Sequence, residues 1–240
     1  MNVLTVVWSE YEIFKNKFWS ITSSAMISPI LYMIAFGWGL GSELGEGTNA
    51  YINYIITGIV GMTSMTASYS AVASSLNTSR IFYKTFEEFM MSPIKPWEYT
   101  TGKIIAGVLR GLYSCAIITV IALIFAKIDV NARFLLSIAA NAFVFASLGF
   151  IIGMVIDSHT DINKFNSFII TPMSFLCGTF FPVDKMPGVL KNIVGILPLS
   201  LTNENIRNVT GPNFTRNIII LLVYLVVFYV LGVRLCNKAE

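Results

Sequence analysis

Residues 134–156 read FLLSIAANAFVFASLGFIIGMVI, a run without a single Asp, Glu, Lys or Arg. An α-helix of about 20 apolar residues crosses the hydrocarbon core of a bilayer, so this run predicts a transmembrane helix. Five further apolar stretches lie at 21–40, 51–76, 104–126, 165–181 and 218–233. Because only helices and closed barrels span membranes, these runs predict an all-α membrane protein with six transmembrane helices.

The composition agrees with a lipid environment. The 240-residue chain is 55% hydrophobic and 12% charged, with a mean hydropathy of +0.71, whereas a soluble domain has about 25% charged residues. The length fits one membrane domain over residues 1–240. A net charge of +3, spread along the chain, does not indicate nucleic-acid binding. The three cysteines form no C-x-x-C motif, which indicates small buried hydrophobic side chains rather than a metal or redox site.

The distribution of basic residues predicts the orientation. With the N-terminus in the cytosol, nine Lys and Arg residues fall in cytosolic segments and six in outer segments. The first outer loop has no basic residue and contains Glu43 and Glu46. The positive-inside rule therefore places both termini in the cytosol.

Residues 1–20 differ from the spans that follow. Leu4, Val7, Tyr11, Phe14 and Phe18 recur at helical spacing, while the charged residues lie mostly off that stripe. This pattern predicts an amphipathic helix in the cytosolic interface of the membrane. Two roles remain open for it, a simple membrane anchor and an elbow helix that also touches a partner subunit.

The loop at 80–98 is the best candidate for a docking element. Its central helix would carry Phe82, Phe86, Phe89 and Met90 on one face, with Glu87 and Glu88 projecting elsewhere. Pro93 and Pro96 would end this helix. A short, stiff, acidic helix suits a soluble partner, and the alternative is a solvated turn with interfacial aromatic residues.

Two groups of motifs then resemble a known family. They are EEFMMSPI at 87–94 with TGK at 101–103, and TPMSFLCGTFFP at 171–182 followed by Met-Pro at 186–187 and Leu-Pro at 197–198. In this order and spacing they resemble the membrane subunit of type-2 ATP-binding-cassette exporters. The resemblance covers nearly the whole chain. It is closest to the branch that exports nodulation lipo-oligosaccharides, O-antigen and small drugs.

The resemblance implies a set of roles. The loop at 80–98 would hold a coupling helix that contacts the partner ATPase through Phe86, Glu87, Glu88 and Phe89. Two copies of this chain would form a homodimer with two ATPase subunits, and residues 182–212 would form re-entrant outer helices. The substrate path would run between the two copies, lined mainly by the first, second and fifth spans.

Those three spans offer a set of aromatic and methionine side chains without fixed charge, namely Tyr32, Met62, Met65, Tyr69, Phe168 and Phe175. Such a lining suits an amphipathic or lipid-linked substrate, and the sequence does not separate a drug, a glycolipid and a polysaccharide. The alternative for the same residues is ordinary packing between spans.

The sequence lacks a phosphate-binding loop, because no G-x-x-x-x-G-K-[ST] motif occurs. This chain alone is therefore not predicted to be an enzyme or to bind a cofactor, and ATP and Mg²⁺ would be held by the partner. A compact chain without a fused ATPase suggests the inner or plasma membrane of a prokaryote. The alternatives are a gradient-driven carrier or channel, which would need acids within the spans, and a membrane-embedded enzyme, which would need clustered catalytic groups.

Three smaller features complete the predictions. His159 lies between Asp157 and Asp161, where a polar turn whose acids cap the next helix is favoured over a metal site. Arg110, inside the third span, either reaches the interface as an anchor or serves a cavity. Gly-x-x-x-Gly pairs at 107–111 and 149–153 are expected to permit close helix packing within the subunit rather than at the dimer seam.

Overall fold

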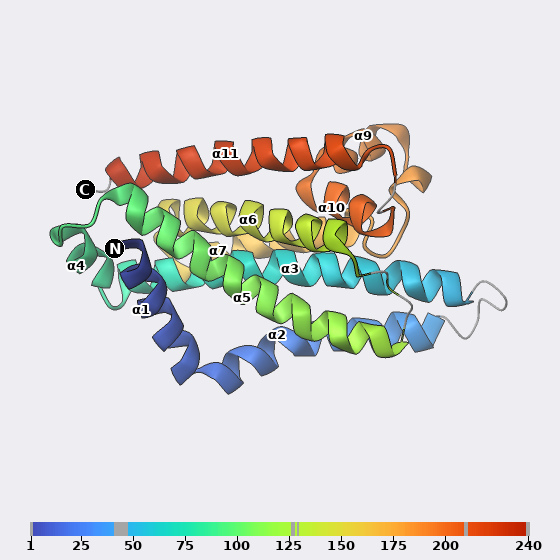
Figure 1. The fold of residues 1–240 in the computed structure, drawn as a ribbon, viewed down its shortest axis with the longest axis horizontal. Helices are drawn as coiled ribbons and strands as arrows, with labels where there is room; N and C mark the ends of the chain where they lie inside the picture. Colours follow the sequence, from blue (N-terminus) through green and yellow to red (C-terminus); the bar gives the residue numbers. More distant parts are fainter. Residues whose placement is uncertain (1, 41–47, 126–127, 129, 209–210, 239–240) are drawn as a thin grey trace.

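The computed structural model describes residues 2–40, 48–125, 128, 130–208 and 211–238 of the chain. All regular elements in these ranges are helical, which confirms the predicted all-α class. The long helices run side by side (Figure 1). The elements are α1 Asn2–Asn16, α2 Phe18–Tyr32, η1 Met33–Leu40, α3 Thr48–Ile81, α4 Thr85–Met91, α5 Pro96–Phe125, α6 Ala132–Val155, α7 His159–Phe165, η4 Asn166–Ile170, α8 Thr171–Leu176, η5 Val183–Lys185, α9 Gly188–Ile196, α10 Pro198–Arg207 and α11 Phe214–Lys238.

Five helical segments of the described chain are long and apolar enough to cross a membrane, at Phe18–Phe36, Tyr51–Ile81, Pro96–Ile124, Ala132–Val155 and Phe214–Lys238. They coincide with five of the six expected spans. The remaining one, expected at 165–181, is built differently, from α7, η4 and α8 in succession. The backbone N–H of Thr171 donates to the carbonyl oxygen of Asn166, five residues earlier, so the helix is wider here than an α-helix. Pro172 follows directly and has no N–H to donate. A sixth crossing at this place remains a prediction.

The centre of the bundle is α3, which packs against both α5 and α6. Both glycine pairs press on it. Gly107 and Gly111 of α5 approach Val72 and Ser68, and Gly149 and Gly153 of α6 approach Tyr69 and Leu76. A methyl group added at Gly149 would lie 2.5 Å from the Tyr69 carbonyl oxygen. The prediction that these pairs serve packing within the subunit is confirmed.

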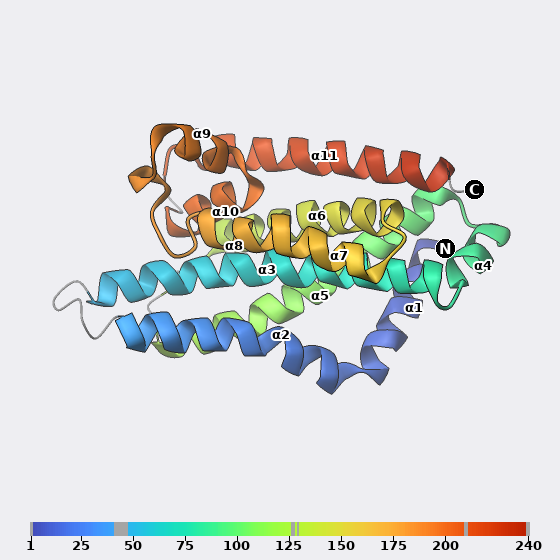
Figure 2. The same cartoon turned by 180° about the vertical axis from the view of Figure 1, so that it is seen from behind.

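The two ends of the bundle are built from different parts of the chain. The start of α1, the end of α11 and α4 share one end, and α9 and α10 lie at the other (Figures 1 and 2). This agrees with the expected placement of both termini and the 80–98 loop on one side of a membrane. Glu43 and Glu46, used to predict the orientation, lie outside the described residues.

Residues 182–212, expected to be re-entrant, contain the short helices α9 and α10. Arg207 fastens α10 to the bundle. Its guanidinium donates to the carbonyl oxygens of Tyr54 at 2.8 Å and Thr179 at 3.3 Å, and its centre lies 3.5 Å from the centroid of the Tyr54 ring. Burial lowers the pKa of Arg207 to about 10, so the group remains charged at neutral pH. Whether this region re-enters a bilayer stays a prediction.

Candidate functional site

The helix expected in the 80–98 loop is α4, Thr85–Met91. Lys84, directly before it, adopts the left-handed conformation with φ of 53°, which turns the chain sharply away from α3. Ser92 is extended, as expected of a residue before proline, and Pro96 opens α5. The prolines therefore delimit the helix as the sequence predicted.

The aromatic face of α4 packs inside the chain. Phe86 is only 6% exposed, and its ring centroid lies 5.4 Å from that of Tyr99 in α5. Phe89 is partly buried, and its centroid is also 5.4 Å from Tyr99. These two rings thus lie against α5, and contact of Phe89 with a partner stays a prediction. The reason is local, because Pro96 starts α5 at once and brings Tyr99 beneath the short helix.

The surface around α4 is formed by other residues. Glu87 and Glu88 are exposed, as predicted. They are accompanied by exposed Phe82, Tyr83, Met91 and Trp97. We call these six residues the α4 surface. The sequence pattern did not single out Tyr83, Met91 or Trp97, although each lies within a few residues of a turn or proline where side chains are left uncovered.

The start of α7 is joined to the end of α3 beside this surface. Arg80 forms an ion pair with Asp157 at 3.0 Å and donates to the carbonyl oxygens of Gly153 and Met154. The His159 ring stacks on Phe82 with centroids 5.1 Å apart. Phe86 and Phe89 of α4 thus contact α5 directly, whereas α7 is reached through Arg80 of α3 and Phe82 in the link before α4.

The polar turn at 157–161 does not assemble a ligand set. Asp157 turns to Arg80, and Asp161 pairs with Lys164 at 2.7 Å. The expectation that these acids cap the next helix is wrong, because the Ser158 side chain is the N-cap and accepts from the N–H of Thr160 at 3.2 Å. Within the described residues, no group of three or more His, Cys, Asp or Glu side chains could hold a metal ion.

The residues proposed for the substrate path fall into two sets. Met62, Met65 and Tyr69 are buried in the core of the subunit, where Tyr69 stacks on Phe165 with centroids 6.2 Å apart. Tyr32 and Phe175 are partly buried and meet edge to face at 6.0 Å. Phe168 is 78% exposed. Helical spacing alone could not separate these sets, since apolar residues line both the core and the outer faces of a membrane helix.

Comparison with known proteins identifies the class. Residues 1–211 match the ABC-2 type transporter family, and the chain belongs to this family. It is a membrane permease subunit, and the nucleotide is bound and hydrolysed by a separate ATPase partner. This favours the first of the three functional hypotheses over a gradient-driven carrier and a membrane-embedded enzyme.

Three relatives illustrate the similarity. The inner membrane transport permease YadH of Escherichia coli (strain K12) is 26% identical over 236 residues, covering 94% of this chain and 92% of the relative. Nodulation protein J of Rhizobium meliloti (strain 1021) is 30% identical over 196 residues, covering 76% and 71%. Nodulation protein J of Rhizobium leguminosarum bv. viciae is 24% identical over 245 residues, covering 99% and 95%.

Proposed function

We propose that two copies of this chain and two ATPase subunits form an exporter in a prokaryotic inner membrane, with both termini and the α4 surface in the cytosol. Family membership is the observation that carries the proposal, since it makes the chain a permease that depends on a separate ATPase. The inner-membrane location follows the name of the relative YadH. The cytosolic side follows the positive-inside argument and the clustering of α4 with the ends of the chain.

The seam between the two copies would lie on the face seen in Figure 2, where α2, α3 and the α7–α8 segment run side by side. In α3, Ser70 is exposed, and in the neighbouring η4, Phe168 is exposed. Hydroxyl groups gain little from lipid contact but are satisfied in a wet or protein-lined cavity. On α11, by contrast, most of the apolar surface is uncovered, which suits lipid.

The substrate would be an amphipathic or lipid-linked molecule. The candidate lining of Phe168, Tyr32 and Phe175 is aromatic, and the neighbouring exposed positions of α3 are hydroxylated without charge. Such a mixture fits a molecule with an apolar tail and a polar, uncharged head. Among the classes that the sequence left open, the relatives named nodulation protein J support a glycolipid.

Coupling would be mechanical. Closure of the two ATPase subunits on ATP would displace α4, whose exposed acids Glu87 and Glu88 contact the partner. Phe86 and Phe89 would then act as the internal joint that transmits the movement to α5 through Tyr99. The contacts of Arg80 and Phe82 would pass it to α7, and the seam would open outward.

Charge reversal of the acids tests this assignment. In the purified complex, replacing Glu87 and Glu88 together by Lys should lower both retention of the ATPase and coupled transport at least tenfold, because like charges then face each other across the contact. Both side chains are exposed, so folding of the permease itself should be unchanged. Subunit retention, ATPase stimulation and transport would be measured side by side.

A matched control is Asp184→Lys, an exposed charge reversal at the opposite end of the bundle. This variant should retain the ATPase. If the doubly reversed protein keeps its ATPase and transports at the normal rate, α4 is not the coupling element.

A further inference from the structure

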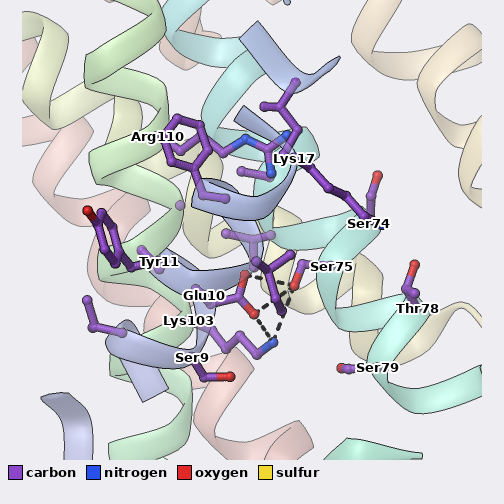
Figure 3. Close-up of a pocket in the computed structure, with 18 of the residues that line it drawn as sticks. Ser9, Glu10, Tyr11, Lys17, Ser74, Ser75, Thr78, Ser79, Lys103 and Arg110 are labelled. Atoms are coloured by element: carbon purple, nitrogen blue, oxygen red, sulfur yellow. Dashed lines mark hydrogen bonds and ion pairs between the residues drawn. The ribbon is translucent and has the colours of Figure 1, made fainter. Parts of the chain in front are cut away.

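A cavity of about 750 Å³ is lined by α1, α3, α4 and α5, at the end of the bundle that carries α4. Figure 3 looks into it. One wall is α1, which is held close to α5 where Val6 meets Gly102, and Asn2 donates to Glu98 at 3.0 Å. Lys17 lies at the bend between α1 and α2. The elbow of the chain therefore forms one side of a pocket instead of only resting on the bilayer.

In the middle of the pocket, one acidic and one basic side chain neutralise each other. Glu10 forms an ion pair with Lys103, and Ser75 donates to both carboxylate oxygens of Glu10, at 2.8 and 2.9 Å. The side chains of Lys103 and Glu10 are both largely buried. This cluster fixes α1 against α3 and α5, and it leaves the Glu10 carboxylate with its hydrogen-bonding positions largely taken.

Two further cations line the same cavity, and Figure 3 draws both at one end of it, away from the ion pair. Arg110 is half-buried and Lys17 is exposed. In the described part of the chain, neither side chain forms a hydrogen bond or an ion pair, and the acids that line the cavity are Glu10, which is paired with Lys103, and Glu88. A half-buried guanidinium without a bidentate acceptor is suited to a phosphate or a carboxylate, which its planar fork can bind through two parallel hydrogen bonds.

The lining around Arg110 and Lys17 is polar on one side and apolar on the other. Ser74 supplies a hydroxyl group on the α3 side, while the Thr78 hydroxyl lies 3.4 Å from Nε2 of His159. On the α1 and α5 side the lining is apolar, with Phe14 and Tyr113 in edge-to-face contact at 5.5 Å and the exposed Leu109 nearby. A ligand held here would thus have an anionic head beside Arg110 and Lys17 and an apolar tail along Phe14 and Tyr113.

We infer that this pocket binds the phosphate headgroup of an anionic phospholipid from the leaflet in which α1 lies. The inference goes beyond export and uses from the proposed function only the position of α1 at a membrane surface. Cytosolic leaflets are rich in anionic lipids, and clustered Lys and Arg side chains at the surface attract them. The lipid is a resident ligand that fills the space beneath the elbow and holds α1, α3 and α5 in register. Arg110 is then a ligand-binding residue within a span, rather than only an anchor that reaches for the interface.

Lipid binding to the purified permease–ATPase complex tests the inference. Dioctanoyl-phosphatidylglycerol should raise the melting temperature of the permease saturably, and dioctanoyl-phosphatidylcholine should do so at least tenfold more weakly. The double variant Arg110→Gln with Lys17→Gln should lose at least tenfold in apparent affinity for phosphatidylglycerol. The matched control, Arg234→Gln with Lys238→Gln, removes one Arg and one Lys from exposed positions near the end of α11 and should bind like the wild type.

Several outcomes would overturn the inference. They are equal affinity for the two lipids, unchanged affinity in the double variant, or the same shift with inorganic phosphate at equal concentration, which would indicate a site for free anions. Should the double variant fail to fold, Lys17→Gln alone, at an exposed position, should still weaken phosphatidylglycerol binding at least threefold.

A transported amphiphile could present the same phosphate chemistry. In nanodiscs, fluorescent phosphatidylglycerol that moves to the opposite leaflet only during ATP turnover would be cargo, and the resident-lipid assignment would be wrong. A complex carrying Glu87→Lys alone, at an exposed residue that does not line the pocket, separates the two proposals. It should lower transport yet keep the phosphatidylglycerol shift of the permease.

Discussion

The helices α3 and α11 are both membrane-spanning candidates by length and composition, yet they occupy opposite environments. The candidate span in α3 has a mean hydropathy of 1.3 and is 83% buried inside the subunit. The one in α11 has a mean hydropathy of 2.7 and is 11% buried. The more apolar helix lies at the edge of the bundle and the less apolar helix lies at its centre (Figures 1 and 2).

This inversion follows from the solvent. Lipid tails are as apolar as leucine, so a lipid-facing helix needs no polar group, whereas a central helix can hold polar groups that neighbouring helices satisfy. The centre of α3 shows this, because the Ser64 hydroxyl donates to the Ile138 carbonyl oxygen of α6 at 3.3 Å, and the Gly61 carbonyl oxygen accepts from the Asn141 side chain of α6 at 3.2 Å. Small residues on α5 and α6 let backbones approach. Hydropathy alone does not rank burial, since the span Phe18–Phe36 has a mean hydropathy of 1.4 and is only 17% buried. Packing depends on shape, which three substitutions can test.

The largest effect is expected where α6 meets the backbone of α3. Gly149→Ala places a methyl group 2.5 Å from the Tyr69 carbonyl oxygen, so a helix must shift, at a cost of about 3 kcal/mol. The matched control is Gly195→Ala in α9, where nothing lies within 4 Å of the added methyl group. The control should be neutral or slightly stabilising, because Ala favours helix more than Gly. Unfolding midpoints in detergent would be compared, and equal midpoints would contradict close packing of α6 on α3.

A second test stays within α11. Leu221 is fully buried against α6 and α10, while the adjacent Leu222 is 48% exposed. Leu221→Ala should therefore cost about 2 kcal/mol through the cavity it leaves. Leu222→Ala should stay within about 0.5 kcal/mol, because lipid or detergent fills the space. The free energies of unfolding of the two variants would be compared by thermal unfolding. Unequal losses would show that α11 packs on the subunit through one narrow face. Equal losses would mean that it packs on all sides.

The smallest effect concerns a polar contact at the centre. The Asn141 side chain of α6 donates to the Gly61 carbonyl oxygen of α3 at 3.2 Å and accepts from the Thr202 hydroxyl of α10 at 3.1 Å. Asn141→Leu should cost about 1 kcal/mol, since interhelical hydrogen bonds in membranes are individually modest. The same substitution at the exposed Asn237 should have no measurable effect. A loss of 3 kcal/mol or more at Asn141 would mean that polar contacts, rather than shape, dominate the packing of α3.

Local sequence signals predicted the elements well, but they could not predict which faces pack together. The prolines around α4 and the glycine pairs acted as expected, because each constrains the backbone where it stands. The aromatic face of α4 was assigned to a partner, whereas Phe86 packs on Tyr99. Helical spacing reveals that a face is apolar, but it does not reveal whether the covering surface belongs to the same chain, a partner or lipid.

The sequence by itself determined the solvent of this protein, the places of its long helices and the absence of a phosphate-binding loop, since these depend on composition and local pattern. Only the tertiary structure decided that α3 is the centre, that Met62, Met65 and Tyr69 are core residues, and that Glu10, Lys103 and Arg110 line one pocket. Glu10 and Lys103 are 93 residues apart in the chain, and their meeting depends on the crossing of α1 with α5 and the approach of α5 to α3. The physical reason is that apolar residues satisfy lipid and protein neighbours equally well, so the fit of side chains, rather than hydropathy, selects the partner of each face.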